Sequence, residues 1–528
     1  MKKFLAFSLL FVLLTTGSTI REKSYYFESD RPHGEVLLHL EGGKYYCLDK
    51  TLPQGKGTSA IKTIYEQTEL GKFHSYEMVF DELNGLSEKY PSKCHTVSLG
   101  QTIEGREIMA LRFQPEKPSP AFLFMGCHHA REWMSVEVPL RLAHILAENP
   151  GNDKRIDKYL ADYDIWIVPM VNPDGHSYSV KENRLWRKNR AKQQGGAVGV
   201  DLNRNYGYKW SEQGASGDPS DETYHGNKPF SENETSIIKA LSEEVPIIGC
   251  LTYHTFGELI LYPWGYTKTK TSFDAKLAKL AEGMAKISGP PNDNDYKEKP
   301  LSDKYDYIPM QASGLYEASG DCTDFLFSEY GTPAFTIEMG ESKDAFAPPD
   351  TMIEPTINQV MEFNFYLLEE APKEFGILYG KVTDIFKNPV QTKITIPGLD
   401  QSLKIDPGTG KFFRVLPKGK YLVSYGKDQK KLVELKDNFQ KVDFIVESDQ
   451  KVSLSGQIFD QLGKPAKRKL QLLDANGNSV EGTAFTERFA YTVPTGYYTI
   501  RVFRQDMGPQ DFKVTLKSNI DIDLIIRE

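Results

Sequence analysis

The chain has 528 residues, of which 39% are hydrophobic and 12% aromatic, a composition typical of globular rather than disordered proteins. Its length exceeds one domain at the usual ~100–200 residues each. The 64 basic and 72 acidic residues leave a net charge of −8, a mild excess that gives no support for nucleic acid or an anionic membrane surface as a partner.

The first residues have the pattern of an export signal. Met1-Lys-Lys3 is basic, an apolar run follows from Phe4 to Leu14, and small residues follow from Thr15 to Thr19. The run is too short to span a membrane. We therefore expect a signal peptide over residues 1–19, a secreted or periplasmic protein without a transmembrane anchor, and an N-terminal extension or short pro-segment over residues 20–70.

Helical and strand-like segments alternate along the next three hundred residues. Apolar residues recur with helical spacing in some segments and form short continuous runs in others. This order predicts an α/β domain over residues 71–371, with one mixed sheet of the eight-stranded type and helices on both faces. The predicted elements are helix 76–90, strands 94–99, 108–113 and 121–127, helix 135–148, strand 165–170, helix 231–243, strand 247–253, helix 272–287, strand 334–337 and helix 352–370.

The C-terminal part has short alternating strands, separated by Gly, Pro and Asn turns, and no helical period. Leu378-Tyr-Gly380 matches Leu454-Ser-Gly456 further along the chain, and Pro-Lys-Gly-Lys-Tyr421 matches a second stretch at nearly the same spacing. Such a repeat predicts two small all-β sandwich domains. Their expected ranges are residues 374–448 and 451–528.

Five cysteines, an odd number, show no spacing typical of a disulfide framework. Cys127 and Cys250 end apolar runs, which favours buried packing residues over a disulfide. Neither has the ligand spacing of a cysteine-based zinc site. The others are Cys47, Cys94 and Cys322.

The stretch His129-Ala-Arg-Glu-Trp133 carries the strongest chemical signal. It lies between the apolar run 121–127 and the amphipathic segment 135–148, a context that predicts a strand, a sharp turn and a helix. An imidazole and a carboxylate three positions apart can face one point. A nitrogen and a carboxylate are also the donors that a hydrolytic zinc ion uses.

Such a site needs a third ligand from a distant part of the chain. Open α/β sheets build their sites at the carboxyl ends of strands, and His254 directly follows the predicted strand 247–253. Together with His129 and Glu132 it gives two histidines and one glutamate. This is a catalytic zinc set that leaves one position open for water.

Eight motifs occur in an order that resembles zinc carboxypeptidases of the carboxypeptidase A, B and T type, over roughly residues 70–371. The resemblance implies one Zn²⁺ per chain, a monomeric enzyme, and peptide or protein C-termini as substrates. The motifs are His129–Trp133, Asn172–Gly175, Arg184–Lys188, Val200–Asn205, His254 with its neighbours, Leu261–Tyr266, Tyr316–Gly320 and Phe335–Met339.

Matching positions imply roles around the metal. His129, Glu132 and His254 correspond to the zinc ligands. Asp201 corresponds to a carboxylate that accepts a proton from His129 and fixes its tautomer. Glu338 corresponds to the general base, which takes a proton from the attacking water and passes it to the leaving amine.

Other matching positions imply contacts with substrate. Arg187 corresponds to the group that stabilises the oxyanion. Asn203 and Arg204 correspond to the pair that grips the terminal carboxylate, a task that suits a planar guanidinium. Tyr316 corresponds to a tyrosine that closes over that carboxylate, and Arg131 to a residue of the next subsite inward.

The pocket for the terminal side chain decides specificity. Thr323 stands at the position where the family has an acid for Lys and Arg or a branched apolar residue for hydrophobic termini. Asp321, two residues earlier, is near enough to reach a cation, and the run Ser319–Asp324 is closest to carboxypeptidase T, whose members are broad. We therefore expect broad specificity. The implied contacts also include Thr255, Leu315, Ala318 and Thr336.

The chain departs from the family in three places. Residues 20–70 are shorter than the usual pro-segment, Phe256 replaces a frequent tyrosine, and two C-terminal modules resembling small transthyretin-like domains are added. Two alternatives therefore stay open. One is a zinc peptidase acting on cell-wall peptides, and the other is a catalytically weak binding protein that uses its β-sandwiches.

Overall fold

The computed structural model describes residues 72–289, 305–340, 346–399, 402–446, 451–480, 484–505 and 507–527, together with the backbone of three short strands nearer the N-terminus. These strands are β1 (Tyr25–Phe27), β2 (Val36–Glu41) and β3 (Lys44–Cys47), and they pair in antiparallel order. The predicted signal peptide over residues 1–19 lies outside the described residues.

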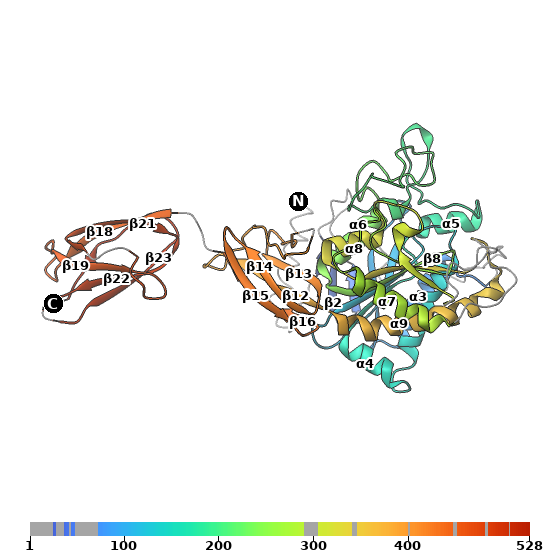
Figure 1. Cartoon of the computed structure of the whole chain (residues 1–528), viewed down its shortest axis with the longest axis horizontal. Coiled ribbons are helices and arrows are strands. Elements are labelled where there is room, and N and C mark those ends of the chain that lie inside the picture. The colour runs from blue at the N-terminus through green and yellow to red at the C-terminus, as the bar shows by residue number, and fades with distance from the viewer. Residues whose placement is uncertain are drawn as a thin grey trace, which may run out of the picture. The chain divides into compact units, whose positions relative to one another are not determined.

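The first of two compact units, Met1–Phe375, is built on one sheet of eight strands, which Figure 1 shows. The strands are β4 (His95–Gln101), β5 (Glu107–Phe113), β6 (Ala121–Gly126), β7 (Asp164–Val168), β8 (Ile247–Thr255), β9 (Leu259–Tyr262), β10 (Ile308–Gln311) and β11 (Ala334–Met339). Their order in the sheet is β10-β9-β11-β8-β6-β7-β5-β4. The central strands β11, β8, β6 and β7 run parallel, whereas β9 with β11, β5 with β7 and β4 with β5 are antiparallel. The predicted mixed sheet is confirmed, with β9 and β10 as strands that the pattern did not indicate.

The two innermost strands, β6 and β8, are buried along their whole length. Every residue of β6 and β8 is buried, as expected for parallel strands covered on both faces. Gly249 in β8 makes room for this packing, because a Cβ there would lie 2.7 Å from the ring of Phe122 and 3.2 Å from Leu367. Strand β8, which ends next to the candidate metal ligand His254, is thereby held tightly against its neighbours.

Helices cover both faces of the sheet, as predicted (Figure 1). They are α2 (Tyr76–Lys89), α3 (Met134–Glu148), α4 (Lys154–Asp162), α5 (Pro173–Lys181), α6 (Asn233–Glu244), α7 (Asp274–Ser288), α8 (Cys322–Tyr330) and α9 (Ile353–Glu374). α3 and α9 pack against β8, and α8 packs against β11. Among the described residues, no helix combines the length and hydrophobicity that crossing a membrane requires.

The four cysteines that the structure describes are buried and carry free thiols. Cys127, which follows β6, and Cys250, in the middle of β8, are buried in the core, as the sequence indicated. Cys94 and Cys322 are also fully enclosed.

The second unit, Gly376–Glu528, is all-β. Its first repeat has a sheet of β12, β13, β16 and β17 and a hairpin of β14 and β15, and its second repeat has one sheet of β18, β21, β24 and β25 and another of β19, β20, β22 and β23. The bounds are β12 (Phe375–Thr383), β13 (Lys411–Pro417), β14 (Gly419–Tyr425), β15 (Gln429–Leu435), β16 (Phe439–Lys441), β17 (Phe444–Ile445), β18 (Lys451–Phe459), β19 (Arg468–Leu473), β20 (Ala484–Thr486), β21 (Arg488–Pro494), β22 (Gly496–Phe503), β23 (Gln510–Leu516), β24 (Ile520–Asp521) and β25 (Leu524–Ile525).

The repeated glycines of the two β modules have one physical cause. A Cβ on Gly380 would clash with the carbonyl oxygen of Val442, and a Cβ on Gly456 would clash with the carbonyl oxygen of Ile522. In both modules a neighbouring backbone therefore approaches too closely for any side chain. The sequence repeat is thus also a repeat of local structure.

Candidate metal centre

The candidate site lies at the carboxyl ends of three neighbouring strands, β6, β8 and β11. His129 and Glu132 occupy the turn between β6 and α3, and His254 is the next-to-last residue of β8. Glu338 on β11 is paired in register with His254. Because these strands run parallel, their carboxyl ends meet at one edge of the sheet, where α/β proteins place their sites.

The turn that carries His129 and Glu132 is fixed by short-range contacts. The backbone N–H of Cys127 donates to Ser135 Oγ at 2.9 Å, and the N–H of Ser135 donates to the carbonyl of Glu132 at 3.0 Å. A Cβ on Gly126 would clash with the carbonyl oxygen of Ser135. The glycine thus lets the start of α3 close onto the end of β6.

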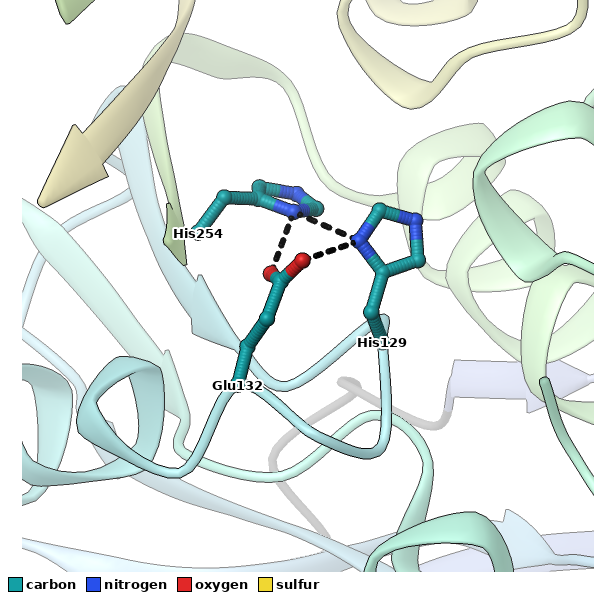
Figure 2. Close-up of side chains that lie close together, drawn as sticks. All are labelled: His129, Glu132 and His254. Carbon is teal, nitrogen blue, oxygen red and sulfur yellow. Dashed lines mark hydrogen bonds and ion pairs between the residues drawn. The ribbon is translucent and has the colours of Figure 1, made fainter. Parts of the chain in front are cut away.

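The three predicted ligands converge, as Figure 2 shows. The Nδ1 atoms of His129 and His254 lie 3.2 Å apart, and the two carboxylate oxygens of Glu132 lie 2.7 and 3.0 Å from them. Two ring nitrogens and a carboxylate thus face one point, which is the arrangement that a metal ion requires. Ligands on one tetrahedral zinc at its usual bond length are separated by about 3.3 Å, so the donor set fits this metal.

Burial and charge prepare these donors for a cation. The side chains are at most 5% exposed. Burial opposes ionisation of Glu132, but His129 and His254 outweigh it and hold its pKa well below the usual range. Burial lowers the pKa of His254, which favours the neutral imidazole that a metal requires.

Asp201 joins the metal ligands to an arginine. It is fully buried, and its Oδ1 lies 3.2 Å from Nε2 of His129. Its Oδ2 accepts from Nε of Arg187 at 2.9 Å, and Oδ1 accepts from the N–H of Asn203 at 3.0 Å. Burial opposes its charge, but Arg187 above all, with His129, holds the pKa of Asp201 well below normal. The carboxylate is therefore ionised and can orient the His129 ring.

Arg187 is tied to the metal-binding turn through its backbone as well. Its carbonyl accepts from the N–H of Ala130 at 2.9 Å. Burial disfavours its charge, yet the carboxylates of Asp201 and Glu132 raise its pKa above the ordinary value. Arg187 thus supplies a permanent positive charge beside the metal donors.

Glu338 lies beside the ligand set without joining it. Shielding of its carboxyl from water raises its pKa well above the usual range, and the negative charge of Glu132 adds to this, against Arg187 and Arg204. A carboxyl poised in this way is suited to take and return a proton.

The residues predicted to hold a terminal carboxylate are brought together. Arg204 is 3% exposed and donates from Nε to the carbonyl of Gly214 at 2.9 Å and from Nη1 to the carbonyl of Asn203 at 2.7 Å. Asn203 Oδ1 accepts from the N–H of Cys322 at 2.9 Å. The ring of Tyr316, which is 53% exposed, lies 5.9 Å from the Arg204 guanidinium. The guanidinium is therefore held in place before any ligand arrives.

Two of the predicted specificity residues, Asp321 and Thr323, lie at the start of α8. Asp321 caps this helix, and its Oδ1 accepts from Thr323 Oγ1 at 2.7 Å and from the N–H of Asp324 at 2.9 Å. The other oxygen, Oδ2, is buried and makes no hydrogen bond. Burial, and then Asp321, raises the pKa of Asp324 well above normal.

The remaining predicted contacts differ in surroundings. Ala318 and Thr336 are buried, whereas Leu315 is 42% exposed. The N–H of Thr255 donates to Glu132 Oε2 at 3.3 Å, which places this residue at the ligands themselves. Arg131 pairs with Glu222 at 3.0 Å and covers the ring of Phe346.

Two charged residues to which the sequence assigned no role, Arg184 and Lys188, hold backbone segments in place. Arg184 donates to the carbonyl of Arg131 at 2.7 Å and stacks 3.6 Å from the ring of Trp133. Lys188 donates from Nζ to two backbone carbonyls of the loop near Pro219. Sequence reasoning missed that Arg184 braces the metal-binding turn, because its partner is a backbone oxygen.

Comparisons with known proteins agree with this geometry. The zinc carboxypeptidase family Peptidase_M14 matches residues 79–363. The chain is 31% identical over 294 residues to carboxypeptidase A2 of Rattus norvegicus, across 54% of this chain and 67% of the relative. It is also 34% identical over 244 residues to the inactive metallocarboxypeptidase ecm14 of Talaromyces marneffei, across 43% and 41%.

A similar fold occurs in a solved structure, that of bovine thrombin-activatable fibrinolysis inhibitor in complex with tick carboxypeptidase inhibitor. The identity is 25%, the TM-score is 0.51, and the match covers 57% of this chain and 98% of the other. All three convergent ligands and Glu338 lie inside the matched residues 79–363.

Proposed function

Given that the chain belongs to the zinc carboxypeptidase family, we propose that it is an exported enzyme that removes single C-terminal amino acids from peptides, with broad specificity. The observation that carries this proposal is the convergence of His129, Glu132 and His254 beside Glu338. Export is included because of the apolar run near the N-terminus.

His129, Glu132 and His254 would hold the metal. A zinc ion bound there would polarise the scissile carbonyl and acidify the attacking water. Asp201 keeps the proton of His129 on Nε2, so that Nδ1 presents its lone pair to the metal. The buried carboxylate of Glu132 supplies the negative charge that offsets the cation.

Glu338 would move the proton of the reaction. It accepts a proton from the water whose oxygen forms the new bond to the carbonyl carbon. It then gives that proton to the nitrogen of the leaving amine as the C–N bond breaks. The raised pKa of Glu338 makes its protonated form a stable carrier between the two steps.

Two arginines would divide the binding of negative charge. Arg187 stabilises the charge that develops on the carbonyl oxygen, because it stays protonated next to the ligands. Arg204 and Asn203 bind the free carboxylate of the substrate, and exposed Tyr316 covers it. A substrate without this carboxylate has no partner for the buried guanidinium, which makes the enzyme an exopeptidase.

Broad specificity is proposed from the pocket at the start of α8. Thr323 and Ala318 offer a small neutral lining, compatible with apolar side chains. The unbonded Oδ2 of Asp321 offers a buried carboxylate oxygen to a Lys or Arg terminus. A pocket with both features accepts apolar and basic residues alike.

A peptide panel with and without a chelator tests this proposal. Blocked dipeptides ending in Phe, Leu, Lys or Arg should be hydrolysed, their C-terminal amides should not, and chelator should stop the reaction. Strict preference for Arg and Lys, with Phe and Leu inert, would reject broad specificity. Cleavage restricted to D-amino-acid or diaminopimelate bonds would favour a cell-wall peptidase.

The same panel tests whether the chain is a weak catalyst that serves as a binding protein. One relative is described as inactive, yet this chain carries every predicted ligand and the base. A metal-loaded protein that hydrolyses none of the peptides would support the binding role. The C-terminal modules contain no histidine or cysteine, so we assign them no chemistry. We further propose that these modules are similar to small transthyretin-like domains.

A further inference from the structure

A further histidine, His128, which is not a predicted metal ligand, is buried behind the ligand His254. The two rings stack at a centroid distance of 5.5 Å and an interplanar angle of 19°. His128 is fully buried and precedes the ligand His129 directly in the chain. A buried histidine is usually a satisfied core residue, so its role depends on where its ring nitrogens point.

Its ring nitrogens belong to a chain of hydrogen bonds that begins at His254. Nε2 of His254, the ring nitrogen opposite the metal-facing one, lies 3.4 Å from Thr252 Oγ1. Thr252 Oγ1 lies 3.3 Å from Nδ1 of His128, and Nε2 of His128 lies 2.8 Å from the hydroxyl of Tyr206. Thr252, His128 and Tyr206 are each 0% exposed, so water does not compete for these groups.

Strand geometry explains the first contact. Thr252 and His254 are two residues apart on β8, and residues at this spacing point to the same side of a strand. The hydroxyl therefore stays beside the ligand ring. Thr252 is the partner that the described residues offer to Nε2 of His254.

Once a metal is bound, the donor and the acceptor of each hydrogen bond from His254 to Tyr206 are fixed. A ligating Nδ1 of His254 must present a lone pair, so Nε2 carries the hydrogen and donates to Thr252 Oγ1. The Thr252 hydroxyl then donates to Nδ1 of His128, and Nε2–H of His128 donates to the Tyr206 oxygen. The Tyr206 hydroxyl ends this chain of hydrogen bonds.

We propose that His128, acting through Thr252, is a positioning residue that holds the metal-binding tautomer and orientation of His254. This inference rests on the proposed zinc site. The two ligand histidines then have different partners at the ring nitrogen that faces away from the metal. His129 has the charged carboxylate of Asp201, whereas His254 has the uncharged hydroxyl of Thr252, followed by His128. Partners of this kind are commonly worth a factor of about 10–100 in metal affinity.

The test is the zinc dissociation constant of the full-length, chelator-treated protein, measured by competition with a chromophoric chelator. Thr252→Val removes the hydroxyl with little change of shape, and Thr252→Ser restores it. We expect Thr252→Val and His128→Phe each to weaken zinc binding about tenfold or more, and Thr252→Ser to stay within about twofold of the parent. Because both residues act in one chain, the double variant should be little weaker than either single variant.

A matched control separates this role from the general loss of a buried imidazole. His176 is also 0% exposed, and neither of its ring nitrogens has a hydrogen-bond partner. His176→Phe should leave zinc affinity unchanged. Cobalt(II) loaded into the same variants gives a second readout, since its visible spectrum reports ligand geometry. We expect a changed spectrum for Thr252→Val and a parental one for Thr252→Ser.

Two outcomes separate this inference from the proposed function. Parental zinc affinity and cobalt spectra in both Thr252→Val and His128→Phe would overturn the role of His128 while leaving the zinc site intact. Failure of the unaltered protein to bind zinc would overturn the zinc site and this role together.

Discussion

Glu338 is paired in register with His254, across the parallel strands β11 and β8. Glu132, the carboxylate of the ligand set, also lies 3.0 Å from Nδ1 of His254. Two carboxyl groups, one a predicted ligand and one not, are therefore neighbours of the same histidine. Metal binding and proton transfer both need a carboxyl group, and here they are assigned to different residues. Glu132 stays ionised to hold a cation, whereas Glu338 has a raised pKa and can carry a proton.

Glu338→Gln should separate proton transfer from metal binding. We expect kcat on a blocked dipeptide to fall by about 10³-fold or more, since general acid–base catalysis contributes about 10²–10⁴-fold. Zinc content should stay at the level of the unaltered protein, because Glu338 is not a ligand. Full turnover by this variant would show that another group is the base.

Asp321→Asn should change specificity without loosening the helix. An asparagine retains Oδ1 as the cap of α8, where it accepts from the N–H of Asp324, and removes only the charge. We expect kcat/KM for Lys and Arg termini to fall about 10–100-fold, the range of a lost charged contact of about 1.5–3 kcal/mol. Values for Phe and Leu termini should change little. An equal loss for all four would show that Asp321 acts only on structure.

Glu234→Gln should remove a pH-dependent loss of stability. Glu234 is 1% exposed, and its Oε1 has no hydrogen-bond partner. Burial, and then Glu232, raises its pKa from 4.5 to about 8. Between these values the folded state binds more protons than the unfolded state, so the unfolding free energy falls as pH rises from about 4.5 to 8 and then levels off.

The difference in Tm between the Glu234→Gln variant and the unaltered protein measures this effect. It should be close to zero at pH 5 and should favour the variant by roughly 5 °C at pH 8, given about 1.4 kcal/mol per pKa unit. A difference that is the same at both pH values would contradict the assigned protonation.

Lys387→Gly should stabilise the first β module. Lys387 has a φ of +67°, and the matching position of the second module is Gly463, with a φ of +75°. Both turns are held by an aspartate, Asp384 or Asp460, that accepts from two backbone N–H groups. A left-handed conformation costs a residue with a side chain about 1–2 kcal/mol. We expect a gain of about 1 kcal/mol, measured by denaturant unfolding of the full chain.

The reverse substitution is the matched control. Gly463→Lys places a side chain in the same turn conformation, and a Cβ there meets nothing within 4 Å. It should lose a similar amount of stability. If neither variant moves the unfolding midpoint, the turn conformation does not contribute as argued.

The sequence predicted the central sheet well because its strands are continuous apolar runs. It missed β9 and β10, which have only four residues each and are the last two strands on one side of the sheet. It also missed α8, since eight of its nine residues are buried and a helix buried all round has no apolar stripe to reveal its period.

The candidate site divides in the same way. His129 and Glu132 were evident from local spacing, and His254 from its place after a strand. Asp201, the partner of His129, followed from the family resemblance. The partners of His254 were not evident, because Thr252 on β8 and His128 after β6 meet only when these two strands pair in the folded sheet. The adjacent histidines 128 and 129 were the one sequence signal that pointed to this chain of contacts.

The central claim is that one zinc ion at His129, Glu132 and His254 drives removal of a C-terminal residue. Zinc titration of the chelator-treated protein tests it most directly, with turnover of a blocked dipeptide as the readout and the C-terminal amide as the comparison. Turnover of the free acid should rise in proportion to zinc, stop rising at one zinc per chain, and be absent for the amide. Turnover without metal, or none at saturating zinc, or equal turnover of the amide, would contradict the account.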